Sequence, residues 1–199
     1  MAYPTVSAPY GLKPVNLVGG RVFAGATRQF PIASGYAANI FNGDVVKLIN
    51  DGTIQKDTGT ATATPVGVFV GCSYTSPALG YTLFSQYYPT GTVASDIVAY
   101  VIDDPDALFK VAVTAAGTAN IATVARTAVG NNSVLIQTAG NTATGDSKIS
   151  ISSTTATTAT QPMRIIDVVP ETATGADAFV EVIVKWNFGM HQYQNATGV

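Results

Sequence analysis

Charge is what this sequence most lacks. Only 11% of its 199 residues are Asp, Glu, Lys or Arg, whereas ordinary soluble domains carry roughly 25%. The net charge is −2 at pH 7, so little electrostatic repulsion separates neighbouring copies, and near-neutral surfaces favour association. Uncharged Thr, Ser, Ala, Asn and Gly must therefore cover most of the surface. This composition indicates a protein that works in contact with other protein.

Cysteine and histidine are each present only once. The single Cys72 excludes an internal disulfide and a multi-cysteine metal site, and its apolar run VGVFVGC favours a buried, unreactive thiol. His191 follows the last expected strand, in a segment expected to be mobile, whereas a catalytic base must be held within hydrogen-bonding reach of its nucleophile. No familiar zinc-ligand spacing is present. We therefore expect no catalytic residue, no metal site and no cofactor, and a protein that is not an enzyme.

Long apolar runs and clusters of basic residues are also absent. No uninterrupted apolar run approaches the ~20 residues of a membrane span. The N-terminus, MAYPTVSAPYGLKP, does not have the basic region followed by an apolar region of a secretory signal. The ten Lys and Arg residues are scattered, with none adjacent, whereas phosphate backbones are bound by clustered positive charge. We expect no membrane and no nucleic-acid partner, and synthesis in a cytoplasm.

One segment has some features of a phosphate-binding loop. In GNTATGDSK, residues 140–148, Gly140 and Gly145 have the spacing of that loop, and Ser147 stands where a hydroxyl would bind Mg²⁺. However, Asp146 occupies the position of the phosphate-binding lysine. The following SKISISSTT alternates like a strand, whereas the loop needs a helix. The sequence therefore predicts a turn between two strands here.

A cluster of acids, IDDPDAL, offers two interpretations. Asp103, Asp104 and Asp106 supply the oxygen ligands that Ca²⁺ prefers. The full calcium-loop pattern, with its central Gly and closing Glu, is missing. Asp-Asp-Pro-Asp is also a good turn sequence, because proline fixes φ and aspartates cap nearby N–H groups. A turn is the favoured interpretation, with a metal site as the alternative.

Strands are expected in succession from Asp44 onward. The segments DVVKLIN and TIQKD flank Asp51-Gly52, a dipeptide that favours a tight hairpin turn. Four further segments are rich in β-branched and aromatic residues and bounded by Gly, Pro or Asp: PVGVFVGCSYT, YTLFSQYYP, DIVAYVID and ALFKVAVTA. Several short strands at this spacing predict a mainly β protein with a single β-barrel or sandwich-like body over residues 44–199. A short helix is expected only near NIATVART, residues 120–127.

The last strand, AFVEVIVKW, shows the alternation of a half-buried strand. Its buried face is expected to contain Val180, Val182, Val184 and Trp186. Glu181 and Lys185 are expected on the solvent face. The segment that follows, residues 187–199, is expected to be a C-terminal tail.

A Thr/Ser/Ala-rich segment interrupts the strand series between about residues 117 and 161. It is polar but nearly uncharged, and SVLIQTA and SKISISS within it still alternate. Both an ordered β insertion and a disordered excursion are compatible with this composition. The alternation favours a β-rich insertion with a flexible tip near residues 153–160.

The first 43 residues differ from the rest in charge and conformation. They contain three basic residues and no acid, while all 12 acids follow from Asp44 onward. Four prolines prevent a helix and favour extended chain, yet the aromatic and aliphatic residues are too apolar for a solvated linker. Residues 1–43 are therefore expected to be an extended N-terminal arm that lies on a surface, either of its own body or of a neighbouring subunit.

Several stretches together resemble a known family. They are MAYPTVSAPYGLKPVNLVGGRVFAGATRQFPIASGYAANIFNGDVV, TPVGVFVGCSYT, YVIDDPDALFKV, RIIDVVPE and EVIVKWNFGMHQY. These stretches are similar to the capsid decoration (cement) proteins of tailed bacteriophages, notably phages of aquatic bacteria. The similarity covers nearly the whole chain and is one of overall sequence rather than of a defined motif.

The resemblance implies a structural virion protein on the outer surface of an icosahedral phage capsid, where it binds the major capsid protein. Such proteins are often homotrimers at three-fold positions, and no catalytic residue comes with the resemblance. The arm is then expected to contact the capsid through Tyr3, Pro4, Tyr10, Lys13, Arg21, Phe23, Arg28 and Phe30. The alternatives are another phage structural component, such as a head-fibre or tail protein, and a carbohydrate-binding β-sandwich.

Overall fold

The computed structural model describes residues 8–172 and 179–199, and these residues are mainly β. One sheet has the strand order β1 (Lys13–Leu17), β8 (Ala107–Thr114), β10 (Ser150–Ala156), β9 (Asn132–Ile136), β11 (Met163–Val168) and β12 (Glu181–Trp186). Because β8 also pairs with β12, the five strands β8–β12 close into a barrel, with β1 lying beside β8. The predicted mainly β fold with a barrel is confirmed.

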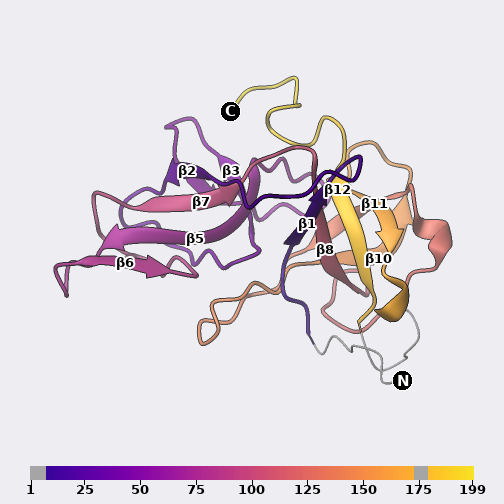
Figure 1. The fold of residues 1–199 in the computed structure, drawn as a ribbon, viewed down its shortest axis with the longest axis horizontal. Helices are drawn as coiled ribbons and strands as arrows, with labels where there is room; N and C mark the ends of the chain where they lie inside the picture. Colours follow the sequence, from indigo (N-terminus) through magenta and orange to yellow (C-terminus); the bar gives the residue numbers. More distant parts are fainter. Residues whose placement is uncertain (1–7, 173–178) are drawn as a thin grey trace.

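A second sheet stands beside the barrel. Its order is β2 (Arg28–Pro31), β7 (Val98–Ile102), β5 (Gly67–Thr75), β3 (Val45–Leu48) and β4 (Ile54–Lys56), and β6 (Thr82–Ser85) pairs with β5. Figure 1 shows this sheet on the left of the elongated molecule and the barrel on the right. The strands between Val45 and Ile102, together with β2, thus form a sheet separate from the barrel, with its own apolar core.

Short turns connect the strands where the sequence predicted them. β3 and β4 pair antiparallel across Asp51-Gly52, and Gly52 has a φ of +82° that suits such a turn. The short helix expected near residues 120–127 is limited to a 3₁₀ turn at Arg126–Ala128. A second 3₁₀ turn follows at Pro170–Thr172.

The segment expected as an insertion contributes two strands that the barrel requires. β9 and β10 are antiparallel neighbours and lie between β8 and β11 in the sheet order. β10 runs parallel to β8, with Ile151 opposite Val113. The β-rich character expected of residues 117–161 is present, but without these strands the barrel would remain open between β8 and β11.

Part of the predicted arm also belongs to the sheets. β1 pairs antiparallel with β8, and β2 pairs antiparallel with β7 at the edge of the second sheet. The chain between them therefore passes from one sheet to the other. These two strands lie on the body of their own chain, which is one of the two arrangements that the sequence left open.

The core of the barrel is centred on Trp186. This side chain is 1% exposed, and its ring lies 5.6 Å from that of Phe109. Val180, Val182 and Val184 are buried beside it, as predicted. Sequence and structure agree on this face because alternate residues of a strand point to the same side.

The prediction that Glu181 faces solvent is wrong. Glu181 is only 4% exposed, because two residues from other segments cover its carboxylate. The Tyr10 hydroxyl donates a hydrogen bond to Oε1, and Lys110 Nζ lies 3.2 Å from Oε2. A carboxylate is tolerated at such a position only when it is paired and hydrogen-bonded.

The two sheets are joined at a buried carboxylate, that of Asp44. Its Oδ2 accepts hydrogen bonds from Lys56 Nζ at 2.8 Å and from the Phe41 N–H at 2.9 Å. Its Oδ1 accepts one from Ser147 Oγ at 2.5 Å. Lys56 belongs to the second sheet and Ser147 precedes β10 of the barrel, so one side chain holds both parts of the molecule.

Replacing Trp186 should destabilise the barrel strongly. We expect Trp186→Ala to lower the free energy of unfolding by about 3–5 kcal/mol, because it leaves a cavity in a packed core. Phe188 is a matched control, since it is aromatic, lies two residues away and is 84% exposed. Phe188→Ala should cost less than about 0.5 kcal/mol. Urea denaturation measures both, and equal shifts would contradict the assigned core.

Asp44→Asn tests the junction. It leaves the Lys56 ammonium, 14% exposed, without its carboxylate, and breaking a buried ion pair costs about 3–5 kcal/mol. Asp167→Asn is the control, because Asp167 and its partner Arg126 are 46% and 75% exposed, and surface pairs contribute about 0–1 kcal/mol. Similar losses of unfolding free energy in the two variants would show that the Asp44 carboxylate is not what holds the two sheets together.

Candidate functional site

The residues expected to contact a capsid mostly have partners in their own chain. Tyr3 and Pro4 lie outside the described residues. Of the other six, Phe30 is buried and Phe23 packs against the barrel core. The remaining four form hydrogen bonds or ion pairs within the chain: Tyr10, Lys13, Arg21 and Arg28. Arg28 shows the pattern most clearly, with Nε 3.1 Å from Asp103 Oδ2 and NH1 3.1 Å from the Tyr193 hydroxyl. Contact of this arm with a capsid stays a prediction.

The acid cluster of residues 103–106 forms a turn between β7 and β8. Asp103 pairs with Arg28, and Asp106 Oδ1 lies 2.8 Å from Lys185 Nζ. Asp104 accepts a hydrogen bond from the Asp106 N–H at 2.8 Å. The carboxylates therefore have separate partners. Among the residues that the structure describes, no group of three or more His, Cys, Asp or Glu side chains is placed to hold a metal ion.

The segment 140–148 is the predicted turn between β9 and β10. Residues 142–145 form the turn, and Asn141 and Asp146 bridge its base. Asp146 Oδ1 lies 3.5 Å from Lys13 Nζ, while Ser147 donates to Asp44. No helix follows the turn, so the backbone dipole that would favour a phosphate is missing.

Cys72 and His191 are both buried. Cys72 is 1% exposed, and desolvation raises the pKa of its thiol to about 12, which keeps the reactive thiolate scarce at neutral pH. His191 is fully buried, its ring 6.2 Å from that of Trp186 and 5.1 Å from that of Tyr193. The expectation that His191 lies in a mobile tail is wrong, because the chain after β12 folds back onto the body.

A different surface, which the sequence interpretation missed, lies on the β5–β6 hairpin. Its exposed apolar side chains are Leu79, Tyr81 and Phe84, at 55%, 56% and 78% exposure. In β6, alternate residues point outward, so Leu83 packs against the core of the second sheet while Phe84 points to solvent. Figure 1 shows β6 at the projecting end of the second sheet. We call Leu79, Tyr81 and Phe84 the hairpin surface.

The hairpin is held in shape by its own hydrogen bonds. At its tip, the Ser76 N–H donates to the Tyr81 carbonyl at 3.0 Å, and the Gly80 N–H donates to the Ser76 carbonyl at 2.8 Å. Next to this turn, at the end of β5, the Asp96 carboxylate accepts from the Thr75 hydroxyl at 2.6 Å and from the Thr75 N–H at 3.0 Å. These hydrogen bonds from Thr75 lower the pKa of Asp96.

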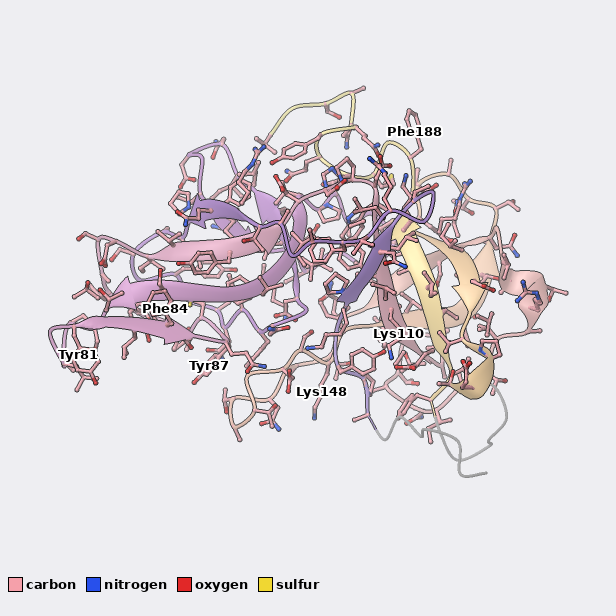
Figure 2. All side chains as sticks on the ribbon, in the orientation of Figure 1. Tyr81, Phe84, Tyr87, Lys110, Lys148 and Phe188 are labelled. Carbon is pink, nitrogen blue, oxygen red and sulfur yellow. The ribbon has the colours of Figure 1, made fainter. Side chains whose placement is uncertain are left out.

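The sequence contains a signal for this surface. Residues 58–95 include no Asp, Glu, Lys or Arg, and the hairpin surface lies within that stretch. Depletion of charge together with exposed aromatic residues is typical of the centre of protein interfaces. Figure 2 shows Tyr81 and Phe84 well separated from Phe188, another exposed aromatic residue.

Comparisons of the chain with protein-family models, with curated proteins and with solved structures found no match. Within residues 8–172 and 179–199, no helix combines the length and the apolar character needed to cross a membrane.

Protonation of His191 should loosen the C-terminal segment. Burial lowers its pKa below the ordinary 6.5, although the nearby Asp103 and Asp104 partly offset this effect. The unfolded chain then binds a proton at a higher pH than the folded chain. The stabilisation from neutral His191 is therefore complete above about pH 6.5 and is lost as the pH falls through the folded-state pKa.

We expect the urea midpoint, followed by Trp186 fluorescence, to fall more steeply below pH 6.5 in the wild type than in His191→Gln. The variant is the control for all carboxylates that titrate in the same range. Parallel pH profiles of the two proteins would contradict the assignment.

Proposed function

We propose that this chain is a structural virion protein that binds the outer surface of an icosahedral phage capsid and stabilises it by bridging neighbouring coat subunits. The hairpin surface carries this proposal: Leu79, Tyr81 and Phe84 are exposed on a projecting hairpin within a charge-free stretch. Exposed apolar side chains that gather on one projecting element are typical of a contact site. The resemblance of the sequence to phage capsid decoration proteins supplies the partner, the major capsid protein.

The size of the hairpin surface favours binding in many copies. A specific interface usually buries about 800 Å² on each partner, and a large aromatic side chain contributes only about 150–250 Å². Three side chains therefore give a weak single contact. A trimer on a lattice of identical coat subunits presents several such contacts at once, and avidity then raises the overall affinity. A homotrimer belongs to the proposal for this reason.

Substitutions in the hairpin test the proposal more clearly than deletion of the arm does. Deletion of residues 1–35 would remove β1 and β2, which pair with β8 and β7, so loss of binding by that variant would be confounded with damage to the fold. Phe84 and Tyr81 are exposed, and their replacement leaves the strand pairing of the hairpin intact.

Replacing the exposed aromatic residues should weaken binding to assembled shells. We expect the double variant Tyr81→Ser/Phe84→Ser to bind shells at least about tenfold more weakly, a loss of about 1.4 kcal/mol. Its unfolding midpoint should stay near that of the wild type. Phe188→Ser is the matched control, because Phe188 is more exposed than either residue and lies elsewhere on the surface. Co-sedimentation with shells assembled without this protein measures the affinity.

Three outcomes would count against the proposal. Binding of the double variant as tight as that of the wild type would remove the hairpin from the interface. Binding to free coat protein as tight as to shells would remove the bridging role. Failure to bind shells, combined with binding of the isolated protein to glycans, would favour the carbohydrate-binding alternative.

A further inference from the structure

Three side chains from distant parts of the sequence meet at the junction between the barrel and the second sheet. Lys13 lies in β1, Asn42 precedes Asp44, and Asp146 ends the turn between β9 and β10. Lys13 Nζ lies 3.2 Å from Asn42 Oδ1 and 3.5 Å from Asp146 Oδ1. An amine, a carboxamide and a carboxylate are thus within reach of one another. They are the three groups needed to form an amide cross-link between side chains.

The backbone and neighbouring side chains hold these groups in place. The Asn42 N–H donates to the Gly145 carbonyl and the Ser147 N–H donates to the Asn42 carbonyl, each at 3.0 Å, so Asn42 is fixed beside Asp146. Asn42 Nδ2 donates to the Val70 carbonyl at 3.0 Å, which turns Oδ1 toward Lys13. Gln86 Nε2 donates to Asp146 Oδ1 at 2.9 Å. Lys13 is positioned by the pairing of β1 with β8.

We propose that Lys13 and Asn42 form an intramolecular isopeptide bond, with Asp146 as the catalytic acid and base. Asp146 accepts a proton from the Lys13 ammonium, and the neutral Nζ attacks Cγ of Asn42. The new Nζ–Cγ bond forms as the Cγ–Nδ2 bond breaks. Asp146 passes protons from Nζ to the departing Nδ2, which leaves as ammonia and takes up the remaining proton as ammonium. The reaction consumes no oxidant, reductant or cofactor.

Positioning makes this reaction feasible without an enzyme. Uncatalysed attack of an amine on an amide is slow, but reacting groups that are held at contact distance gain a large effective concentration. A carboxylate at the site also supplies the proton transfers that the expulsion of ammonia requires. The Lys13 and Asp146 side chains are 37% and 39% exposed, so water competes for the ammonium. We therefore expect the bond to form slowly after folding, when the triad is in place.

The same asparagine has a competing reaction. Asn42 precedes Gly43, and attack of the Gly43 nitrogen on the Asn42 side chain would also expel ammonia and give a succinimide. In the structure the Gly43 N–H donates to the Phe69 carbonyl at 2.8 Å, which engages this nitrogen elsewhere. The two products have the same mass, so the test must separate them by whether two tryptic peptides are joined and by the dependence of the mass loss on Lys13.

The bond would join two parts of the molecule covalently. Lys13 belongs to the strand beside the barrel, and Asn42 lies in the loop before β3 of the second sheet. The link closes the chain segment between residues 13 and 42 into a loop and limits separation of the two sheets. It does not depend on the identity of the partner proposed above.

Mass spectrometry of the intact, full-length protein tests the proposal. After prolonged incubation at neutral pH, we expect the mass to fall by one ammonia. Trypsin should then release residues 1–21 joined to residues 29–47, because Lys13 is followed by Pro14 and this bond resists cleavage. Two variants should keep the full mass: Lys13→Arg, which keeps the charge but cannot form the bond, and Asp146→Asn, which lacks the acid and base.

Lys148→Arg is the matched control, because it changes a lysine next to the same turn and should still lose ammonia. Wild-type protein that keeps its full mass and yields separate peptides would overturn the proposal. Loss of ammonia that persists in Lys13→Arg would overturn it as well and identify the succinimide as the product. Because the wild type alone gives a decisive readout, a variant that fails to fold would not obscure the result.

Discussion

The buried carboxylate of Asp44 is the constraint on which the arrangement of the two sheets depends. It has no exposed surface, and its partners come from the second sheet, from the loop before β3 and from the turn before β10. A buried charge is costly unless its hydrogen-bonding capacity is met, so the three donors must be in place together. This requirement fixes the position of the barrel relative to the second sheet more tightly than apolar contact would, because hydrogen bonds are directional.

The backbone around this carboxylate is packed too closely for ordinary side chains. A Cβ on Gly11 would lie 2.7 Å from the Gly43 carbonyl oxygen, and one on Gly140 would lie 2.3 Å from the Phe41 ring. The Leu12 N–H also donates to the Gly43 carbonyl at 3.0 Å. Glycine at these positions thus lets the arm, the loop before Asp44 and the turn at 140–148 meet directly. The same close approach brings Lys13, Asn42 and Asp146 together.

The sequence predicted local structure well and long-range partners poorly. The alternation of AFVEVIVKW indicated which valines are buried, and Asp51-Gly52 indicated a hairpin, because both signals depend on neighbouring residues alone. The prediction that Glu181 faces solvent is wrong because the Tyr10 hydroxyl, which donates a hydrogen bond to its carboxylate, lies 171 positions away in the sequence. The prediction of a mobile segment around His191 is wrong for a similar reason, since Gln192 exchanges hydrogen bonds with the backbone of the distant Leu48. Periodicity cannot indicate such partners. The hairpin surface differs, because the missing charge in residues 58–95 was visible in the sequence.

The few charged residues are distributed in a way that bears on how the proposed partner would be bound. At least seven of its ten Lys and Arg residues pair with carboxylates of the same chain. Several of these pairs tie the arm or the last strand to the body, as Arg28 does with Asp103 and Lys185 with Asp106. Most charged side chains thus form ion pairs within the chain, and the hairpin surface is apolar and uncharged.

Contact through such a surface depends on desolvation rather than on ion pairs and is only weakly sensitive to salt. An uncharged surface also lacks the opposite charges that orient two proteins as they approach each other. Binding specificity must therefore come from shape and from several contacts made at once. The lattice of coat subunits proposed above would provide that repetition.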